Sequence, residues 1–282
     1  MSLPLHCEQL RLIADLAASR TPFWDPIFRF LNYADSSYFV FVLIPLVWVG
    51  FSWRWGLRLF YLVTISTLLN AFFKELIGWP RPCTDAPEVG MLCIRGFGFP
   101  SGGAQTCMLL GGLLIYTWRT RAAWVLGVLY IALVSFSRLY LGVHYPIDIL
   151  GGWAIGLALL GLYIWWIGPI ERFLHSKRLE TGFVLSEVFP LLLMLGSTSS
   201  LYHRVDAMAV GLGAFLSLKY HLYLPAPKTI QAGLIRGTIA VIGLFLILAV
   251  LPPSWPISVK YAILALWLSL GASPACRVCR AF

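Results

Sequence analysis

The sequence predicts an all-α protein that crosses a membrane several times as a helical bundle. Of its 282 residues, 59% are hydrophobic and only 12% are charged, and the mean hydropathy is +0.81. A soluble domain carries about 25% charged residues, so this chain has too few polar groups to cover a surface in water. Its apolar runs are long and continuous, whereas the strands of a membrane β-barrel alternate over about ten residues. The composition therefore excludes soluble, disordered and coiled-coil proteins.

Residues 1–36 form an N-terminal segment in which charged side chains interrupt the apolar ones. Pro22 and Pro26 divide this segment, and a proline inside a helix ends or kinks it. We expect one or two short amphipathic helices that lie on the membrane surface. The scattered charges differ from the uninterrupted apolar core of a cleavable signal peptide, so none is expected.

About nine apolar segments follow, each near the length of about 20 residues that a spanning helix needs. The earlier segments are continuous, and those after residue 180 are weaker or interrupted. The segments cover residues 37–53, 59–78, 101–118, 122–141, 146–168, 182–196, 205–224, 235–251 and 258–274. We expect them to form one helical bundle.

The net charge of +9 comes from 21 lysines and arginines against 12 aspartates and glutamates. In a soluble chain this balance suggests nucleic acid, but in a membrane protein basic loops set the orientation and contact anionic headgroups. The bilayer is therefore the expected partner, and nucleic acid is not. Outside the N-terminal segment and the motifs below, most basic residues fall on the face that carries the C-terminus. The positive-inside rule then places the C-terminus in the cytoplasm and the N-terminus outside.

The six cysteines lack the dense pattern of a secreted disulfide scaffold. Cys83 and Cys93 share one predicted loop and could pair, and the sequence leaves this open. Cys276 and Cys279 form a single C-x-x-C pair, and one such pair without a second is weak evidence for zinc. We expect no metal site.

Three segments place ionisable and small residues at helix ends on the outer face, where a charge is costly unless it is functional or paired. They are Lys74–Pro82, Pro100–Gln105 and Ser137–Asp148. In the second segment, Ser101, Gly102 and Gly103 begin a predicted helix. The free N–H groups and dipole of a helix start favour an anion, and glycine lets the backbone approach it closely.

The first and third segments add charges and a nucleophile to this anion site. Lys74, Arg81 and Arg138 supply three positive charges, and guanidinium groups donate paired hydrogen bonds to phosphate oxygens. His144 precedes the fifth apolar segment, and Asp148 lies in its first turn. A carboxylate beside an imidazole fixes its tautomer and stabilises the cation formed when the other nitrogen reacts.

At these residues the sequence resembles the phosphatidic acid phosphatase type 2 superfamily, which includes lipid phosphate phosphatases and glucose-6-phosphatase relatives. The signature of that family is K-x6-R-P, then P-S-G-H, then S-R-x5-H-x3-D. The chain matches it at Lys74, Arg81, Pro82, Pro100, Ser101, Gly102, Ser137, Arg138, His144 and Asp148. It departs from the signature at Gly103, where the family has histidine. The motifs span residues 74–148, about a quarter of the chain.

The resemblance implies a membrane phosphatase for phosphorylated lipids that needs no cofactor or metal, because three cations stabilise the phosphoryl charge. His144 would attack phosphorus and form a phosphohistidine, and Asp148 would orient the His144 ring. Arg138 would stabilise the charge on the phosphoryl group in the transition state. The expected phosphate-binding residues are Lys74, Arg81, Ser101, Gly102, Gly103 and Arg138.

The resemblance also divides the chain. It implies a six-helix-type phosphatase core at residues 37–170, with the active site on the periplasmic, extracellular or lumenal face. The segment 1–36 would lie on the membrane, helices in 171–274 would complete the bundle, and 275–282 would be a cytoplasmic tail. A plan of nine spans with an outward N-terminus resembles glucose-6-phosphatase more than the six-span lipid phosphatases.

Gly103 leaves three functions open. In the family the second-motif histidine protonates the leaving group, and general acid catalysis contributes about 10²–10⁴-fold. An active enzyme without it should prefer a lipid diphosphate, such as a polyprenyl diphosphate, because the departing phosphate is less basic than an alkoxide. Asp85, Glu88 or His203 could replace the acid. The alternatives are a silent lipid-phosphate binder and a lipid-phosphate transporter, and the oligomeric state stays unknown.

Three other histidines carry no motif. His6, His175 and His221 stand alone in predicted loops or surface segments. A lone polar ring is most often found in water, so we expect all three to be solvated.

Overall fold

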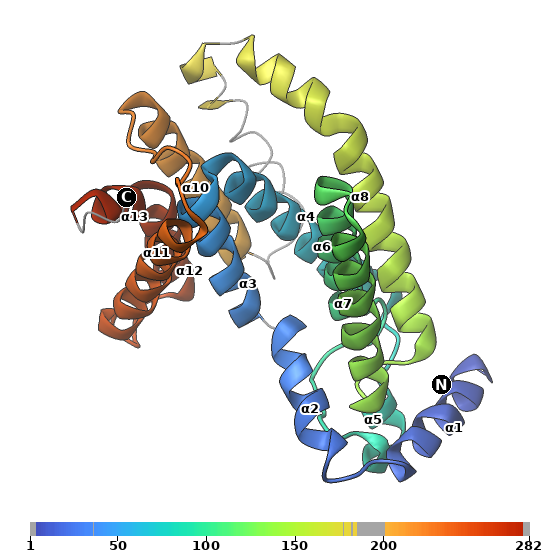
Figure 1. Ribbon diagram of the computed structural model, residues 1–282. Coiled ribbons are helices and arrows are strands. Elements are labelled where there is room, and N and C mark those ends of the chain that lie inside the picture. The colour runs from blue at the N-terminus through green and yellow to red at the C-terminus, as the bar shows by residue number, and fades with distance from the viewer. Residues whose placement is uncertain (1–3, 36, 177, 182, 185–200, 279–282) are drawn as a thin grey trace. The chain divides into compact units, whose positions relative to one another are not determined.

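The computed structural model describes residues 4–35, 37–176, 178–181, 183–184 and 201–278 (Figure 1). Every regular element in these ranges is helical, which confirms the all-α class. Five helices among them are long and apolar enough to cross a membrane, and Phe39–Phe51 and Ala207–Lys219 are shorter apolar helices. The chain is therefore an integral, multi-pass membrane protein. The expected segment 182–196 lies almost wholly outside the described residues, so the count of nine spans stays a prediction.

The chain forms two compact units. The first consists of residues 1–39 and 65–166, and the second of residues 40–64 and 167–282. All three motifs lie in the first unit. The boundaries expected at residues 36, 170 and 274 remain predictions.

The first unit is built around two packed helices and the ends of two longer ones. Its elements are α1 (Pro4–Ala18), α2 (Trp24–Leu31), the 3₁₀ turn η1 (Asn32–Asp35), α5 (Pro82–Asp85), the 3₁₀ turn η3 (Pro87–Val89), α6 (Gly102–Trp118) and α7 (Arg121–Tyr140). The C-terminal part of α4 (Trp53–Ile77) and most of α8 (Pro146–His175) complete it.

Local signals in the sequence set the ends of these helices. Arg119 ends α6 in a left-handed conformation with φ of 50°. Thr120 then caps α7, because its Oγ1 accepts a hydrogen bond from Ala123 N at 3.1 Å. Pro146 begins α8, where the missing N–H costs nothing. These ends agree with the expected spans to within about two residues, although α8 continues through Pro169 beyond its expected end.

Helices α6 and α7 pack closely because glycines face each other. A Cβ atom built on Gly111 would lie 2.9 Å from the carbonyl oxygen of Gly127, and one built on Gly127 would lie 2.8 Å from that of Gly111. Small residues at such a contact let the backbones of two membrane helices approach. Gly111 therefore lies at the contact between α6 and α7.

The N-terminal helices dock on the loops that carry the motifs, at the lower end of this unit in Figure 1. Ile13 of α1 is fully buried against Ala86, Val89 and Tyr145. The guanidinium of Arg20 donates to the carbonyl oxygens of Tyr140 and Val89 at 2.6–2.9 Å. These contacts join residues more than sixty positions apart, so the N-terminal segment is part of the wall around the motifs.

The second unit is a separate helical bundle. It begins within α3 (Ser37–Pro45), at Val40, and includes the start of α4. Its other elements are a π-helical turn η2 (Leu46–Phe51), α10 (Leu201–Lys219), α11 (Ile230–Val250), α12 (Ile257–Leu266), a second π-helical turn η4 (Trp267–Gly271) and α13 (Ala272–Val278). η2 packs closely on α11, since a Cβ on Gly50 would lie 2.6 Å from Gly233 O. None of the motif residues lies in this unit.

Candidate active site

His144 lies in the short loop between α7 and α8 and is only 5% exposed. The loop turns at Gly142, whose φ of +68° favours glycine. A Cβ at this position would also overlap the Val89 carbonyl oxygen. Pro146 then starts α8 and places Asp148 in its first turn. The spacing of His144 and Asp148 therefore brings their side chains to one buried point.

Hydrogen bonds define which nitrogen of His144 carries the proton. Nδ1 lies 3.2 Å from Oδ2 of Asp148, and the same oxygen accepts from the backbone N–H of Tyr145 at 2.9 Å. On the other side, Nη1 of Arg81 lies 3.2 Å from Nε2. A guanidinium can only donate, so Nε2 accepts and the neutral ring keeps its proton on Nδ1, facing Asp148. The lone pair of Nε2 therefore faces the cation.

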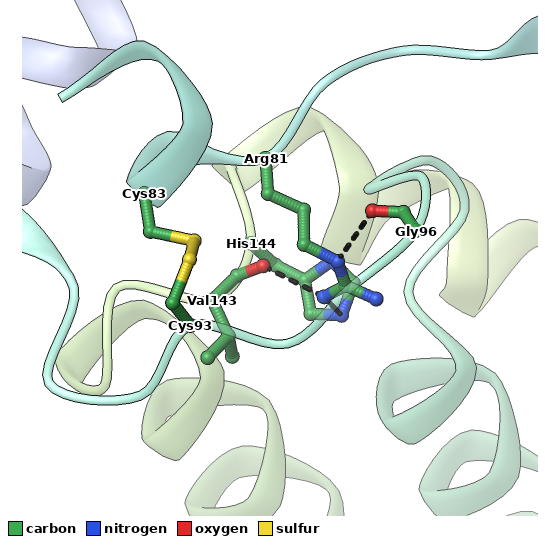
Figure 2. Close-up of a disulfide and its surroundings, with 6 residues drawn as sticks. All are labelled: Arg81, Cys83, Cys93, Gly96, Val143 and His144. Carbon is green, nitrogen blue, oxygen red and sulfur yellow. Dashed lines mark hydrogen bonds between the residues drawn. A yellow bond between two sulfur atoms is a disulfide. The ribbon is translucent and has the colours of Figure 1, made fainter. Parts of the chain in front are cut away.

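Backbone carbonyls hold Arg81 in place beside this ring. Its Nε donates to Gly96 O and its Nη1 to Val143 O, both at 3.0 Å (Figure 2). The side chain is 6% exposed. Because two loops share one guanidinium, Arg81 ties the first motif to the third.

Hydrogen bonds also anchor the other two motif cations. Lys74 Nζ donates to the carbonyl oxygens of Phe97 and Gly98 at 2.9 and 3.0 Å. Arg138 Nη1 donates to Oδ1 of Asn32 at 2.8 Å, and the arginine is 3% exposed. All three predicted cations therefore lie in one unit with His144.

The surroundings lower the pKa of His144 well below its usual value. Burial is the largest cause, and the positive charges of Arg81, Lys74 and Arg138 act in the same direction. A buried ring among cations is favoured in its neutral form. The neutral form of the imidazole is therefore favoured.

The start of α6 lies directly against the third motif. Ser101 is its N-cap, with Oγ accepting from Ala104 N at 3.4 Å, and its own N–H donates to the Asp148 carbonyl at 2.9 Å. Gly152 of α8 allows this approach, since a Cβ there would lie 2.5 Å from Ser101 O. Gly103 is buried in the first turn of α6.

A buried polar network that the sequence analysis did not identify supports this helix start. Asn70 Nδ2 donates to Pro100 O at 3.3 Å and to Gln105 Oε1 at 3.0 Å. Gln105 Nε2 in turn donates to the carbonyl and hydroxyl oxygens of Ser66 at 2.7 and 2.8 Å. Asn70 stands one turn before Lys74 in an apolar helix. A polar amide in a membrane-spanning helix is costly unless it is hydrogen-bonded. The presence of Asn70 in this apolar helix was therefore the sequence feature that could have indicated the network.

The structure pairs Cys83 with Cys93, which the sequence had left open (Figure 2). The closed loop contacts the histidine loop, because Met91 N donates to Leu141 O at 3.0 Å. Leu92 packs on the cluster that contains Leu141 and Val143. The disulfide therefore braces the backbone that carries His144.

His6 is only 1% exposed, so the prediction that it is solvated is wrong. Its ring stacks on Tyr145 with centroids 4.5 Å apart and meets Trp79 edge-on at 5.4 Å. Burial lowers the pKa of His6. The sequence pattern failed here because α1 folds back on the motif loops, a contact that no local periodicity reveals. His221 is exposed as predicted, and the His175 side chain lies outside the described residues.

The structure separates the three residues considered as replacement acids. Asp85 Oδ2 accepts a hydrogen bond from the Tyr145 hydroxyl at 2.7 Å. Glu88 is exposed on η3. The side chain of His203 lies outside the described residues. No contact in the described part of the chain brings Asp85 or Glu88 to His144.

Comparisons with known proteins agree with this arrangement. Residues 55–172 match the PAP2 superfamily. The chain is 35% identical over 42% of its length to an undecaprenyl-diphosphatase of Sulfolobus acidocaldarius, covering 58% of that protein. It is 26% identical over 60% of its length to lipid phosphate phosphatase delta of Arabidopsis thaliana, covering 44% of that protein. The chain thus spans about half the length of these curated relatives.

The fold is also that of a solved relative. The crystal structure of a transmembrane PAP2-type phosphatidylglycerolphosphate phosphatase from Bacillus subtilis superimposes with a TM-score of 0.51 at 24% identity. The match covers 60% of this chain and 89% of that one. The matched region, residues 55–172, contains every motif residue on which the predicted resemblance rests. The chain therefore carries a PAP2 superfamily domain.

Proposed function

We propose that this chain is a membrane phosphatase that hydrolyses phosphorylated lipids through a phosphohistidine on His144. One observation carries the proposal. Nδ1 of a buried imidazole faces Asp148 while Nε2 faces the Arg81 guanidinium. A nucleophile therefore points at a group suited to bind phosphate, and its rear nitrogen is held by a carboxylate.

The first step transfers the phosphoryl group to the histidine. The Nε2 lone pair forms a bond to phosphorus, and the phosphorus–oxygen bond to the leaving group breaks with its electrons on that oxygen. Asp148 stabilises the resulting cationic ring through Nδ1. Lys74, Arg81 and Arg138, with the N-terminus of α6, stabilise the phosphoryl oxygens.

The second step returns the enzyme to its starting state. Water adds to phosphorus, the phosphorus–nitrogen bond breaks, and its electron pair returns to Nε2. Both protons of the water leave on the phosphate product, so the neutral His144 ring is restored. No other proton acceptor is required for balance.

Gly103 limits which leaving group can depart. Its hydrogen side chain cannot donate a proton, so an alkoxide would leave without assistance. When the substrate is a lipid diphosphate, the leaving group is a lipid monophosphate, which is a much weaker base than an alkoxide. We therefore propose a lipid diphosphate, such as a polyprenyl diphosphate, as the preferred substrate.

A phosphate-release panel tests the function and the preference together. Wild type, His144→Ala and Gly103→His are assayed with a polyprenyl diphosphate and with the monophosphate of the same lipid. We expect His144→Ala to abolish release and Gly103→His to raise monophosphate turnover by about 10²-fold with little change for the diphosphate. Equal wild-type turnover of both lipids would sink the leaving-group argument. No release from either would favour a silent binder, and counterflow without release would favour a transporter.

We further propose that the site faces the periplasm, cell exterior or an organelle lumen, with the C-terminus in the cytoplasm. The Cys83–Cys93 disulfide supports this face, since disulfides persist in oxidising compartments. Labelling of Glu88→Cys by an impermeant maleimide tests it. We expect reaction from outside in intact cells at residue 88, and at Arg119→Cys, beyond the other end of α6, only after lysis. The reverse pattern would refute the orientation.

A further inference from the structure

Helix α2 lies against the end of a membrane span. Its buried residue, Phe28, stacks on Tyr140 with centroids 4.1 Å apart and contacts Phe136 at 5.4 Å. Both partners belong to the last turns of α7, whose other end begins at Arg121. Because α7 is long and apolar enough to span a membrane, we place the boundary between hydrocarbon and water at the level of Phe136 and Tyr140. Helix α2 therefore lies at that boundary.

The rest of α2 exposes large apolar side chains. Phe28 is the buried residue of this helix, and Asp25 and Leu31 are partly buried, whereas three large apolar side chains of the helix and its N-cap Phe23 are exposed. The exposed side chains are Phe23 (67%), Trp24 (47%), Ile27 (38%) and Phe30 (72%). Aromatic residues at the membrane boundary favour the headgroup layer. The occupant that fits this patch is a phospholipid surface, because the helix lies where lipid headgroups must be.

Two hydrogen bonds connect the same element to the candidate site. Asp25 Oδ1 accepts from the Tyr140 hydroxyl at 2.7 Å. Asn32, which follows α2 in η1, accepts from Arg138 Nη1 at 2.8 Å. Both α7 partners lie within the seven residues that precede His144. Asn32 therefore links the end of α2 to the Arg138 guanidinium.

We propose that residues 23–33 form a lipid-contact element that seats the active site at the headgroup layer, with Asn32 as a positioning residue for Arg138. The proposal rests on the proposed phosphatase function. A phosphate carried by a lipid lies at the depth of the headgroups, and so do the aromatic side chains of α2. Their contact with lipid holds Arg138 at the depth where such a substrate arrives.

The lipid contact is tested without any activity. Phe30→Cys is prepared in a Cys7→Ser background, labelled with a nitroxide and reconstituted in phosphatidylcholine vesicles. We expect the label to be more accessible to oxygen than to an aqueous nickel chelate. The matched control, Glu88→Cys on the exposed η3 turn, should show the reverse. Preference for the nickel chelate at residue 30, or protection from both reagents by a covering protein surface, would overturn the lipid contact.

The coupling is tested with two substrates that share one headgroup. One is a long-chain lipid phosphate in vesicles and the other a short-chain, water-soluble analogue. Phe23→Ser/Phe30→Ser should lower kcat/KM about tenfold for the vesicle substrate and leave the soluble one unchanged. Trp118→Ser, an equally exposed residue at the far end of α6, is the control and should alter neither. An equal loss on both substrates would refute a role in lipid contact.

Asn32 should act differently from the aromatic residues. Asn32→Ala should lower kcat/KM for both substrates, and Asn32→Asp, which keeps an oxygen acceptor for Arg138, should restore much of the loss. A structural role alone would not predict rescue by aspartate, so failure of that rescue would overturn the positioning role. If wild type releases no phosphate from either substrate, the phosphatase proposal fails, while the nitroxide result still decides the lipid contact.

Discussion

Gly152→Ala tests whether the close approach of α8 and α6 sets the position of Ser101, one of the proposed phosphate-binding residues. The added Cβ would lie 2.5 Å from Ser101 O and 2.9 Å from Gln105 N. An ordinary carbon–oxygen contact is about 3.4 Å, so the start of α6 must move by about 0.9 Å. A displacement of about 1 Å at a reacting group costs about 10²-fold in rate. We expect kcat/KM to fall by that factor.

The assay for this variant is phosphate release, read together with thermal unfolding in detergent. The structure offers a matched control in the same helix, because a Cβ at Gly161 meets nothing within 4 Å. Gly161→Ala should keep full activity and gain about 0.5–1 kcal/mol in the free energy of unfolding. Gly152→Ala should lower the free energy of unfolding by about 1–3 kcal/mol. If Gly152→Ala is as active as Gly161→Ala, the position of Ser101 does not limit catalysis and the reasoning fails.

Three further predictions concern the same site. Burial and nearby cations lower the pKa of His144 below 6.5, so just below pH 6.5 the unfolded chain takes up a proton that the folded chain does not. The free energy of unfolding of wild type should therefore decrease, relative to that of His144→Gln, by up to about 1.4 kcal/mol for each unit by which the pH falls. Unfolding measured from pH 8 to 5 checks this, and parallel curves for the two proteins would contradict it. Cys83→Ser/Cys93→Ser should lower the free energy of unfolding by about 2–4 kcal/mol and should also lower phosphate release. Melting curves with and without reductant check the loss of stability, since reductant should affect only wild type. Asn70→Leu should lower the free energy of unfolding by about 1–3 kcal/mol, because it leaves Gln105 without one hydrogen-bond partner. An unchanged melting temperature would refute the contribution of this polar network to stability.

Much of the fold was predictable because it depends on local properties of the chain. Low charge and continuous apolar runs are enough to indicate membrane helices, and capping residues such as Thr120 and Pro146 fix their ends to within about two residues. The family was predictable because its motifs keep fixed spacings near helix ends. The long stretch around residues 182–196 was less clear, since its apolar run is interrupted.

The candidate site was only partly predictable from sequence. The spacing of His144 and Asp148 on one loop and helix turn was enough to place them together. Asn70 and Gln105 were missed as a pair because their bond joins two helices 35 residues apart. His6 was misjudged for the same reason, since the residue that buries it, Tyr145, lies far along the chain.

The sequence alone determined that this protein spans a membrane and that its motif spacings match the PAP2 superfamily, and it predicts that Gly103 replaces the signature histidine. These properties reside in composition and short-range spacing. The tertiary structure alone decided that Cys83 pairs with Cys93, that Asn32 reaches Arg138, and which nitrogen of His144 faces Arg81. Such contacts depend on how distant segments pack, and helical periodicity contains no information about the partner across a packed interface.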